Sequence, residues 1–210
     1  MSQLNVNKIT GTTGTTSGAP ITLSADTATL GSGVTNNAGV ASGTIASGVT
    51  FPAGGTGNPI SVAVICDEKS YNTTGGSVSA TTWTTRDLNT VISDPDSIVS
   101  ISSNQFTIGA GTYLVEWSTP AYVVADMKSI LYDITGSAVA HVGTSEYGGD
   151  SSSSSTGKSI GSVIITPSSS NAYEIRLYAQ WAKPGNGLGT TAGTPNNVSI
   201  YTVVKIFKLK

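Results

Sequence analysis

The amino-acid sequence predicts an all-β protein, in which an extended N-terminal β stem is followed by an antiparallel sandwich or barrel. Three observations carry this prediction. The unit Thr29–Thr35 returns fifteen residues later as Thr44–Thr50, in a stretch without helical periodicity. Short β-rich runs then follow one another at spacings of about ten residues. Charge is almost confined to the second part of the chain, which sets a boundary near residues 57–67.

The first predicted part, residues 1–58, is poor in both charge and large apolar side chains. Only Lys8 and Asp26 are charged before Cys66. Such a segment cannot bury enough surface alone to offset its ordering entropy. It is either a flexible linker or a repeated unit that stacks or winds with copies of itself. The repeat keeps the spacing of its apolar residues, which favours an ordered stem.

Composition excludes several classes of function. The 210 residues include 10 basic and 12 acidic side chains, so no basic field indicates nucleic-acid binding. Charged residues make up 10% of the chain, far below the globular norm of about 25%. No apolar run approaches the roughly 18 residues of a membrane span. The N-terminus shows no basic region followed by an apolar core, so we expect synthesis in a cytoplasm without a signal peptide.

The second predicted domain, residues 59–210, contains ten candidate strands separated by turn-forming residues. Many short strands at such spacing indicate an antiparallel sandwich or barrel. The candidates are Ile60–Cys66, Trp83–Leu88, Ile98–Ser102, Gln105–Ile108, Thr112–Thr119, Ser129–Ile134, Ala138–Gly143, Ile160–Thr166, Ala172–Ala182 and Val198–Leu209.

Two of these strands predict which faces are covered. One strand alternates a dry face with a wet face. Its dry face consists of Tyr173, Ile175, Leu177, Ala179 and Trp181, and its wet face of Glu174, Arg176, Tyr178 and Gln180. The last strand is apolar on both sides, with Tyr201, Val203 and Phe207 on one face and Ile200, Val204 and Ile206 on the other. An antiparallel strand of this kind needs a second cover, so Tyr201, Val203 and Phe207 are predicted to form a subunit interface.

The run Phe106-Thr107-Ile108-Gly109-Ala110-Gly111-Thr112-Tyr113-Leu114-Val115-Glu116 resembles the "Phe…Gly-Thr-Tyr" strand pair of complement globular-head and tumour-necrosis-factor-like jelly rolls. Further segments resemble the version of that domain found in bacteriophage fibre and virion proteins. They are Trp83–Thr90, Ser102–Phe106, Pro120–Tyr122, Gly143–Tyr147 and Ile200–Lys208. The leader also resembles phage structural proteins, in Leu4–Ile9 and in the two Ser-Gly-Val-Thr units.

This resemblance implies a jelly-roll knob, a homotrimer and a place on the surface of a virion, with the N-terminal segment attached to other virion proteins. Two functions remain open. One is a tail fibre or spike whose knob binds a glycan or protein on the host surface. The other is a capsid decoration protein, either a cement protein or a head fibre, that stabilises the phage head. A free carbohydrate-binding module fits the stem-like leader less well. Fold resemblance alone does not decide between them.

Two polar, Gly-rich loops flanked by aromatic residues are the candidate receptor-binding sites. The first runs from Tyr147 through Asp150 to Lys158, and the second from Lys183 through Asn186 to Pro195. Loops on a rigid scaffold are common recognition sites, and aromatic rings with amides suit sugars. Solvated connectors of no fixed shape are the alternative interpretation.

The sequence gives no support for catalysis, a metal site or a cofactor. His141 is the single histidine and is predicted to be a strand residue satisfied by a neighbour. Ser151–Ser155 is a polyserine loop and not a nucleophile elbow. Asp94-Pro95-Asp96 is predicted to be a turn and not a calcium ligand set. Cys66, the single cysteine, ends an apolar run and is predicted to be a buried structural thiol.

Overall fold

The computed structural model describes residues 60–192 and 197–209, and the predicted stem with its boundary at residue 58 lies outside this part. The described part contains eleven strands and no helix. The strands are β1 (Ser61–Lys69), β2 (Trp83–Thr85), β3 (Thr90–Ser93), β4 (Val99–Ser102), β5 (Gln105–Ile108), β6 (Tyr113–Tyr122), β7 (Asp126–Asp133), β8 (Ala138–Tyr147), β9 (Thr156–Ile165), β10 (Asn171–Ala179) and β11 (Ser199–Lys208).

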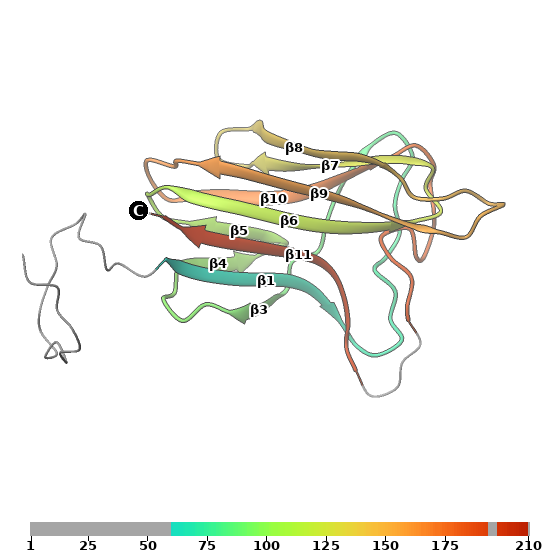
Figure 1. Cartoon of the computed structure of the whole chain (residues 1–210), viewed down its shortest axis with the longest axis horizontal. Helices are drawn as coiled ribbons and strands as arrows, with labels where there is room; N and C mark the ends of the chain where they lie inside the picture. The colour runs from blue at the N-terminus through green and yellow to red at the C-terminus, as the bar shows by residue number, and fades with distance from the viewer. Residues whose placement is uncertain (1–59, 193–196, 210) are drawn as a thin grey trace, which may run out of the picture. The chain divides into compact units, whose positions relative to one another are not determined.

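These strands form two sheets that face each other as a jelly-roll sandwich (Figure 1). The first sheet has the order β3-β1-β11-β6-β9, and the second has the order β4-β5-β10-β7-β8 with β2 also paired to β10. All strand pairs are antiparallel. The predicted fold class of the knob, an antiparallel jelly-roll sandwich, is therefore confirmed.

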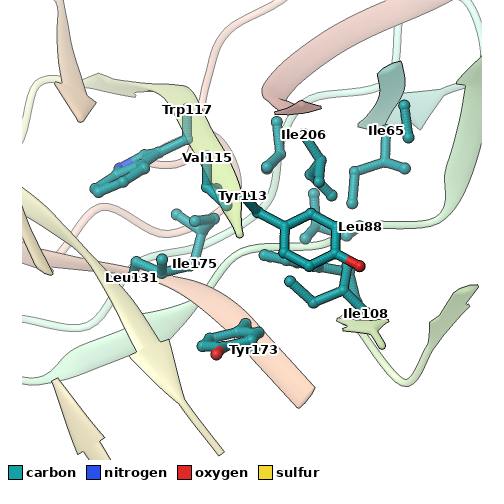
Figure 2. Packing of buried hydrophobic residues seen from close by; sticks show 13 residues of the cluster. Ile65, Leu88, Ile108, Tyr113, Val115, Trp117, Leu131, Tyr173, Ile175 and Ile206 are labelled. Carbon is teal, nitrogen blue, oxygen red and sulfur yellow. The ribbon is translucent and has the colours of Figure 1, made fainter. Parts of the chain in front are cut away.

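Buried and more exposed side chains alternate along the central strands, and the buried ones form the core between the sheets. In β6, Tyr113, Val115 and Trp117 are buried while the residues between them are half-exposed. The buried residues of both sheets form one main cluster (Figure 2). Its members are Ala63, Ile65, Leu88, Phe106, Ile108, Tyr113, Val115, Trp117, Leu131, Tyr173, Ile175, Val204 and Ile206.

A second, smaller cluster fills the part of the sandwich where β6 turns into β7. Its members are Val78, Ala121, Val124, Met127, Leu177, Ala179 and Leu188. Leu188 comes from the segment after β10, so that segment is part of the core and not a free connector.

Most candidate strands are present, with shifted ends. The candidate Gln105–Ile108 is confirmed as β5. Strand β8 continues past the predicted range Ala138–Gly143, and β9 begins before the predicted range Ile160–Thr166. The additional residues are mostly polar, but they still pair with the neighbouring strands. Strand β3 was not predicted, since its four residues, Thr90–Ser93, lack a periodic pattern.

The predicted faces of the β10 strand need two corrections. The strand ends at Ala179, so Trp181 lies beyond the sheet with 44% of its surface exposed and does not belong to the dry face. Glu174 was predicted to be on the wet face, but it is 5% exposed. Its carboxylate forms an ion pair with Arg176 and accepts a hydrogen bond from Thr85 Oγ1, so the charge is compensated in place.

Candidate functional site

The outer face of the first sheet carries apolar side chains that are half-buried or exposed. Register places Phe207, Leu114 and Ile164 side by side across β11, β6 and β9, and Val203 beside Ser118 and Ile160. These residues alternate with the buried core residues of the same strands. We use the name apolar face for the set Val62, Val64, Leu114, Ile160, Ile164, Val203 and Phe207.

A hollow of about 770 Å³ lies on this side of the first sheet. Val203, Ile160 and neighbouring residues of β6 and β8 line it. Glu116 and Lys205, which are paired in register, contribute one charge of each sign to the lining. Ile160 and Ile164 are 50% and 60% exposed, which is far above the exposure of a core isoleucine. A contiguous apolar surface of this kind marks an interaction site.

The three predicted interface residues of the last strand do not share one environment. Val203 and Phe207 are half-buried members of the apolar face. Tyr201 is 8% exposed and is covered by its own subunit, because its ring lies against Gly189 and its hydroxyl donates to the Thr73 carbonyl oxygen at 2.6 Å. On the opposite side of the strand, Val204 and Ile206 are core residues.

The first predicted loop is shorter than expected, because Tyr147 ends β8 and Lys158 lies within β9. The carboxylate of Asp150 organises the remaining turn. It accepts hydrogen bonds from the backbone N–H and hydroxyl of Ser152 and of Ser153, and from the Tyr147 hydroxyl at 2.8 Å. The Ser152 hydroxyl is the main cause that lowers the pKa of Asp150 far below its ordinary value. Asp150 therefore stays charged and orients the Tyr147 ring.

The second predicted loop is pinned to the body of the domain. Lys183 pairs with Val78 as an isolated bridge, and its ammonium lies 5.7 Å from the centroid of the Tyr122 ring. Asn186 closes a tight turn, since its N–H donates to the Pro184 carbonyl and its own carbonyl accepts from Gly189. Residues 193–196 of this loop lie outside the described part.

The β6–β7 turn brings both loops together. Tyr122 N–H donates to the Gly187 carbonyl of the second loop, and Val123 N–H donates to the Gly148 carbonyl of the first. Val123 and Ala125 have positive φ angles of 54° and 57°, which are uncommon for residues with a Cβ and rarest for β-branched ones. The surrounding hydrogen bonds hold this strained backbone in place.

A buried ion pair lies beneath the second loop. Arg86 is fully buried, and its guanidinium donates to Thr202 Oγ1 at 2.7 Å and to the Leu188 carbonyl at 2.8 Å. Asp67 is also fully buried, 4.0 Å from the Arg86 guanidinium and 3.2 Å from the Lys69 ammonium. Burial raises the pKa of Asp67 and lowers that of Arg86 to about 10, so Arg86 is charged at neutral pH.

The remaining residues singled out from the sequence have structural positions. His141 lies in β8 with its ring edge-on to Trp117, at 6.1 Å between centroids. Cys66 is buried, which confirms the expected environment, and burial raises the pKa of its thiol. Asp94 closes a turn by accepting from the N–H groups of Ile98 and Val99, as predicted. Within residues 60–192 and 197–209, no group of three or more His, Cys, Asp or Glu side chains could hold a metal ion. The same residues contain no helix that is long and apolar enough to cross a membrane.

Sequence reasoning found two members of the apolar face and missed five, namely Val62, Val64, Leu114, Ile160 and Ile164. These five are distributed over three strands that are far apart in the sequence. The alternation within each strand marks them as one side of a sheet, but only the register shows that those sides form one surface.

Comparison with known proteins gives a structural likeness without a sequence relationship. The sequence matches no protein-family profile and no curated protein at a significant level. Murine APRIL at pH 8.0 is similar in structure, with 10% identity and a TM-score of 0.45, over 71% of this chain and 99% of that one. The globular domain of zebrafish complement 1qA protein is similar with 13% identity and a TM-score of 0.45, over 71% and 98%. The fold assignment rests on the sheets described above.

Proposed function

We propose that this protein is a non-enzymatic structural component of a phage virion, a homotrimeric tail fibre or spike whose jelly roll binds the host surface. The observation that carries the trimer is the apolar face on the first sheet. Seven large or branched apolar side chains over four strands, arranged around the single pair Glu116 and Lys205, form a surface that subunit contact would remove from water.

The second sheet presents a different outer surface. It carries Asp126, Lys128, Glu174 and Arg176, together with aromatic rings. The first sheet is therefore the one that favours a neighbouring subunit, and the second sheet remains open to solvent and ligands. The three-fold arrangement is what the resemblance of Phe106–Glu116 to complement globular-head and tumour-necrosis-factor-like jelly rolls implies. The phage context comes from the resemblance of the leader, and of segments such as Trp83–Thr90 and Ile200–Lys208, to phage fibre and virion proteins.

The test of the trimer is a pair of adjacent substitutions in β11. Val203→Lys should give a folded monomer, because the charge lies on the apolar face. Val204→Lys should unfold the subunit, because burial of an unpaired charge in the core costs several kcal/mol. Light scattering should give three times the 21.2 kDa chain mass for the wild type and for Ser100→Lys, an exposed control on β4. A wild-type protein that is monomeric at micromolar concentration would contradict the proposed trimer.

The position on the particle is tested by competition. If the protein is a fibre, purified trimer added to host cells should block attachment of virions, and labelled antibody should mark the tail in electron micrographs. If the protein decorates the capsid, the same trimer should leave attachment unchanged. Particles without it should then lose heat resistance, and the capsid decoration function would replace the fibre.

A further inference from the structure

A groove of about 490 Å³ crosses the outer face of the second sheet where β7, β8 and β10 lie side by side. Its volume falls in the range of ligand sites, about 300–1,000 Å³. It lies on the side of the sandwich away from the apolar face. Its lining residues are Asp126, Met127, Lys128, Ser145, Glu146, Tyr147 and Tyr178.

Aromatic rings lie in and beside this groove. Register places Trp83, Tyr178, Lys128 and Ser145 in one row across β2, β10, β7 and β8. The Trp83 and Tyr178 rings pack edge to face, with 5.6 Å between centroids. Trp83 and Tyr147 are 40% and 51% exposed, so ring surface is available to a ligand. The apolar C–H face of a pyranose ring packs well against such surfaces.

The polar groups of the groove are uncommitted. The side chains of Asp126 and Lys128, which lie on the outer face of β7, make no hydrogen bond or ion pair with other described residues. The Asp126 carboxylate can accept hydrogen bonds from sugar hydroxyls, and the Lys128 ammonium can donate to a ring or hydroxyl oxygen. One carboxylate and one ammonium leave the outer face of the groove without excess positive charge to hold phosphate, sulfate or carboxylate groups.

The groove is also rigid at one end. Asp126 follows directly on the strained turn with positive φ at Val123 and Ala125. Its backbone carbonyl accepts from Gln180 N–H at 2.8 Å. Asp150 holds the Tyr147 hydroxyl on the other side. Backbone strain held by its surroundings is typical of ligand sites, because it fixes side chains before the ligand arrives.

We infer that this groove binds neutral oligosaccharides, with Tyr178 and Tyr147 contacting the sugar rings and Asp126 accepting hydrogen bonds from their hydroxyls. Asp150 is a positioning residue that acts through Tyr147. The inference deepens the proposed function, because it gives the ligand class of the knob and places the site in the groove, away from the tips of the two loops.

The experiment uses the full-length trimer and three probes, chitohexaose, maltohexaose and polysialic acid, in saturation-transfer NMR and calorimetric titration. At least one neutral probe should bind with a Kd on the order of 1 mM, and polysialic acid should not bind. Tyr178→Ala and Asp126→Asn should each weaken binding about tenfold or more. Tyr132→Ala is the matched control, because that ring lies outside the groove and stacks on Arg176. Asp150→Asn should weaken binding and increase the mobility of the Tyr147 ring signals, whereas a purely structural role would leave binding unchanged.

Absence of binding by both neutral probes at about 20 mM, or affinity unchanged in Tyr178→Ala and Asp126→Asn, would overturn the inference. Stronger binding of polysialic acid than of the neutral probes would also overturn it. The function proposed above fails by other results, namely a wild-type monomer or an inability of the purified trimer to block virion attachment. If neither neutral oligosaccharide binds but the purified trimer still blocks virion attachment, only the ligand class is rejected and the proposed function stands.

Discussion

Arg86 shows how one buried cation can hold three separate segments of this sandwich. Its backbone N–H donates to Ile175 in β10, and its side chain reaches Thr202 in β11 and Leu188 in the loop after β10. Removing two charges from water is expensive, and geometry must compensate for it. The compensation is incomplete, because neither oxygen of Asp67 accepts a hydrogen bond from a described residue. The Arg86–Asp67 pair therefore contributes more to the position of the loop after β10 than to the net free energy of folding.

Removal of Arg86 should be costly. Arg86→Met leaves the buried Asp67 carboxylate with Lys69 as its remaining cation and removes the donor to the Leu188 carbonyl. We expect the free energy of unfolding in urea to fall by about 3–5 kcal/mol. Lys158→Met, at an exposed lysine in β9, should change the free energy of unfolding by about 0.5 kcal/mol or less. The double variant Arg86→Met/Asp67→Asn should recover part of the loss, and equal losses in the single and double variants would contradict this account.

Asp67 should also leave a signature in the pH dependence of stability. Burial raises the pKa of this carboxyl above its ordinary 3.8, against the attraction of Lys69 and Arg86. The folded chain then holds the proton more tightly than the unfolded chain does. The contribution of Asp67 is fully present below pH 3.8 and is lost as pH rises through the folded pKa.

We therefore expect the stability of the wild type relative to Asp67→Asn to increase as pH is lowered from 7 toward 4, in urea titrations at each pH. The opposite slope would mean that the two cations outweigh burial and lower the pKa of Asp67. If the free energy of unfolding has the same pH dependence in the wild type and in Asp67→Asn, other carboxyl groups cause that dependence.

Among the strands, the approach of β8 to β9 closes one side of the sandwich. Ser159 Oγ donates to the Thr144 carbonyl at 2.7 Å and accepts from Ser129 N–H. Since its single proton is used, the Ser129 hydroxyl must donate in the 2.7 Å contact between Ser129 and Ser159. Ser129 Oγ in turn accepts from Trp117 Nε1 at 2.8 Å. This buried hydroxyl cluster is fully paired, which makes it compatible with the core.

Glycine at position 161 is required for this closure. A methyl group there would overlap the Trp117 ring, which lies over Gly161 in the neighbouring strand. Gly161→Ala should displace the indole, weaken its hydrogen bond to Ser129 and lower stability by about 1–3 kcal/mol. Gly109→Ala is the control, because no atom lies within 4 Å of the added carbon. Urea unfolding followed by tryptophan fluorescence measures both, and equal effects would contradict the steric argument.

The elements differ in how far their sequence predicted them. Strand β5 and the centre of β10 follow from strict alternation of apolar and polar residues. The ends of β8 and β9 were missed, because hydroxyl-rich segments such as Thr156–Ser159 have loop composition but complete ladders here. Glu174 lies on the predicted side of β10 but is not exposed, because Arg176 and Thr85 pair its carboxylate there. Trp181 does not belong to the dry face, because the strand ends at Ala179 before the apolar pattern does.

At the scale of the whole molecule, the two sheets divide the surface into one apolar face and one polar, aromatic face. Sequence predicted that a second cover was needed, because both sides of β11 are apolar. The extent of that surface and the groove on the other sheet depend on register between strands distant in the chain, which no local pattern contains. The two candidate loops were identified from sequence, and backbone groups of Gly148, Gly149 and Gly187 in them bind the turn Tyr122–Ala125. Their role in receptor binding stays a prediction.

Binding multiplicity, and not the affinity of one groove, should set the strength of adhesion. If the protein forms the proposed trimer, its three jelly-roll domains bind a surface with an effective concentration that a monomer lacks, so weak sites add. On a chip densely coated with a neutral oligosaccharide that binds in solution, the wild-type trimer should be retained about 100-fold more tightly than the Val203→Lys monomer. Affinity per site in solution should be equal for the two proteins, because Val203 lies on the opposite sheet from the groove. On a sparsely coated chip, where two knobs cannot bind at once, the difference should disappear. Retention that is independent of ligand density would show that the trimer does not add weak contacts.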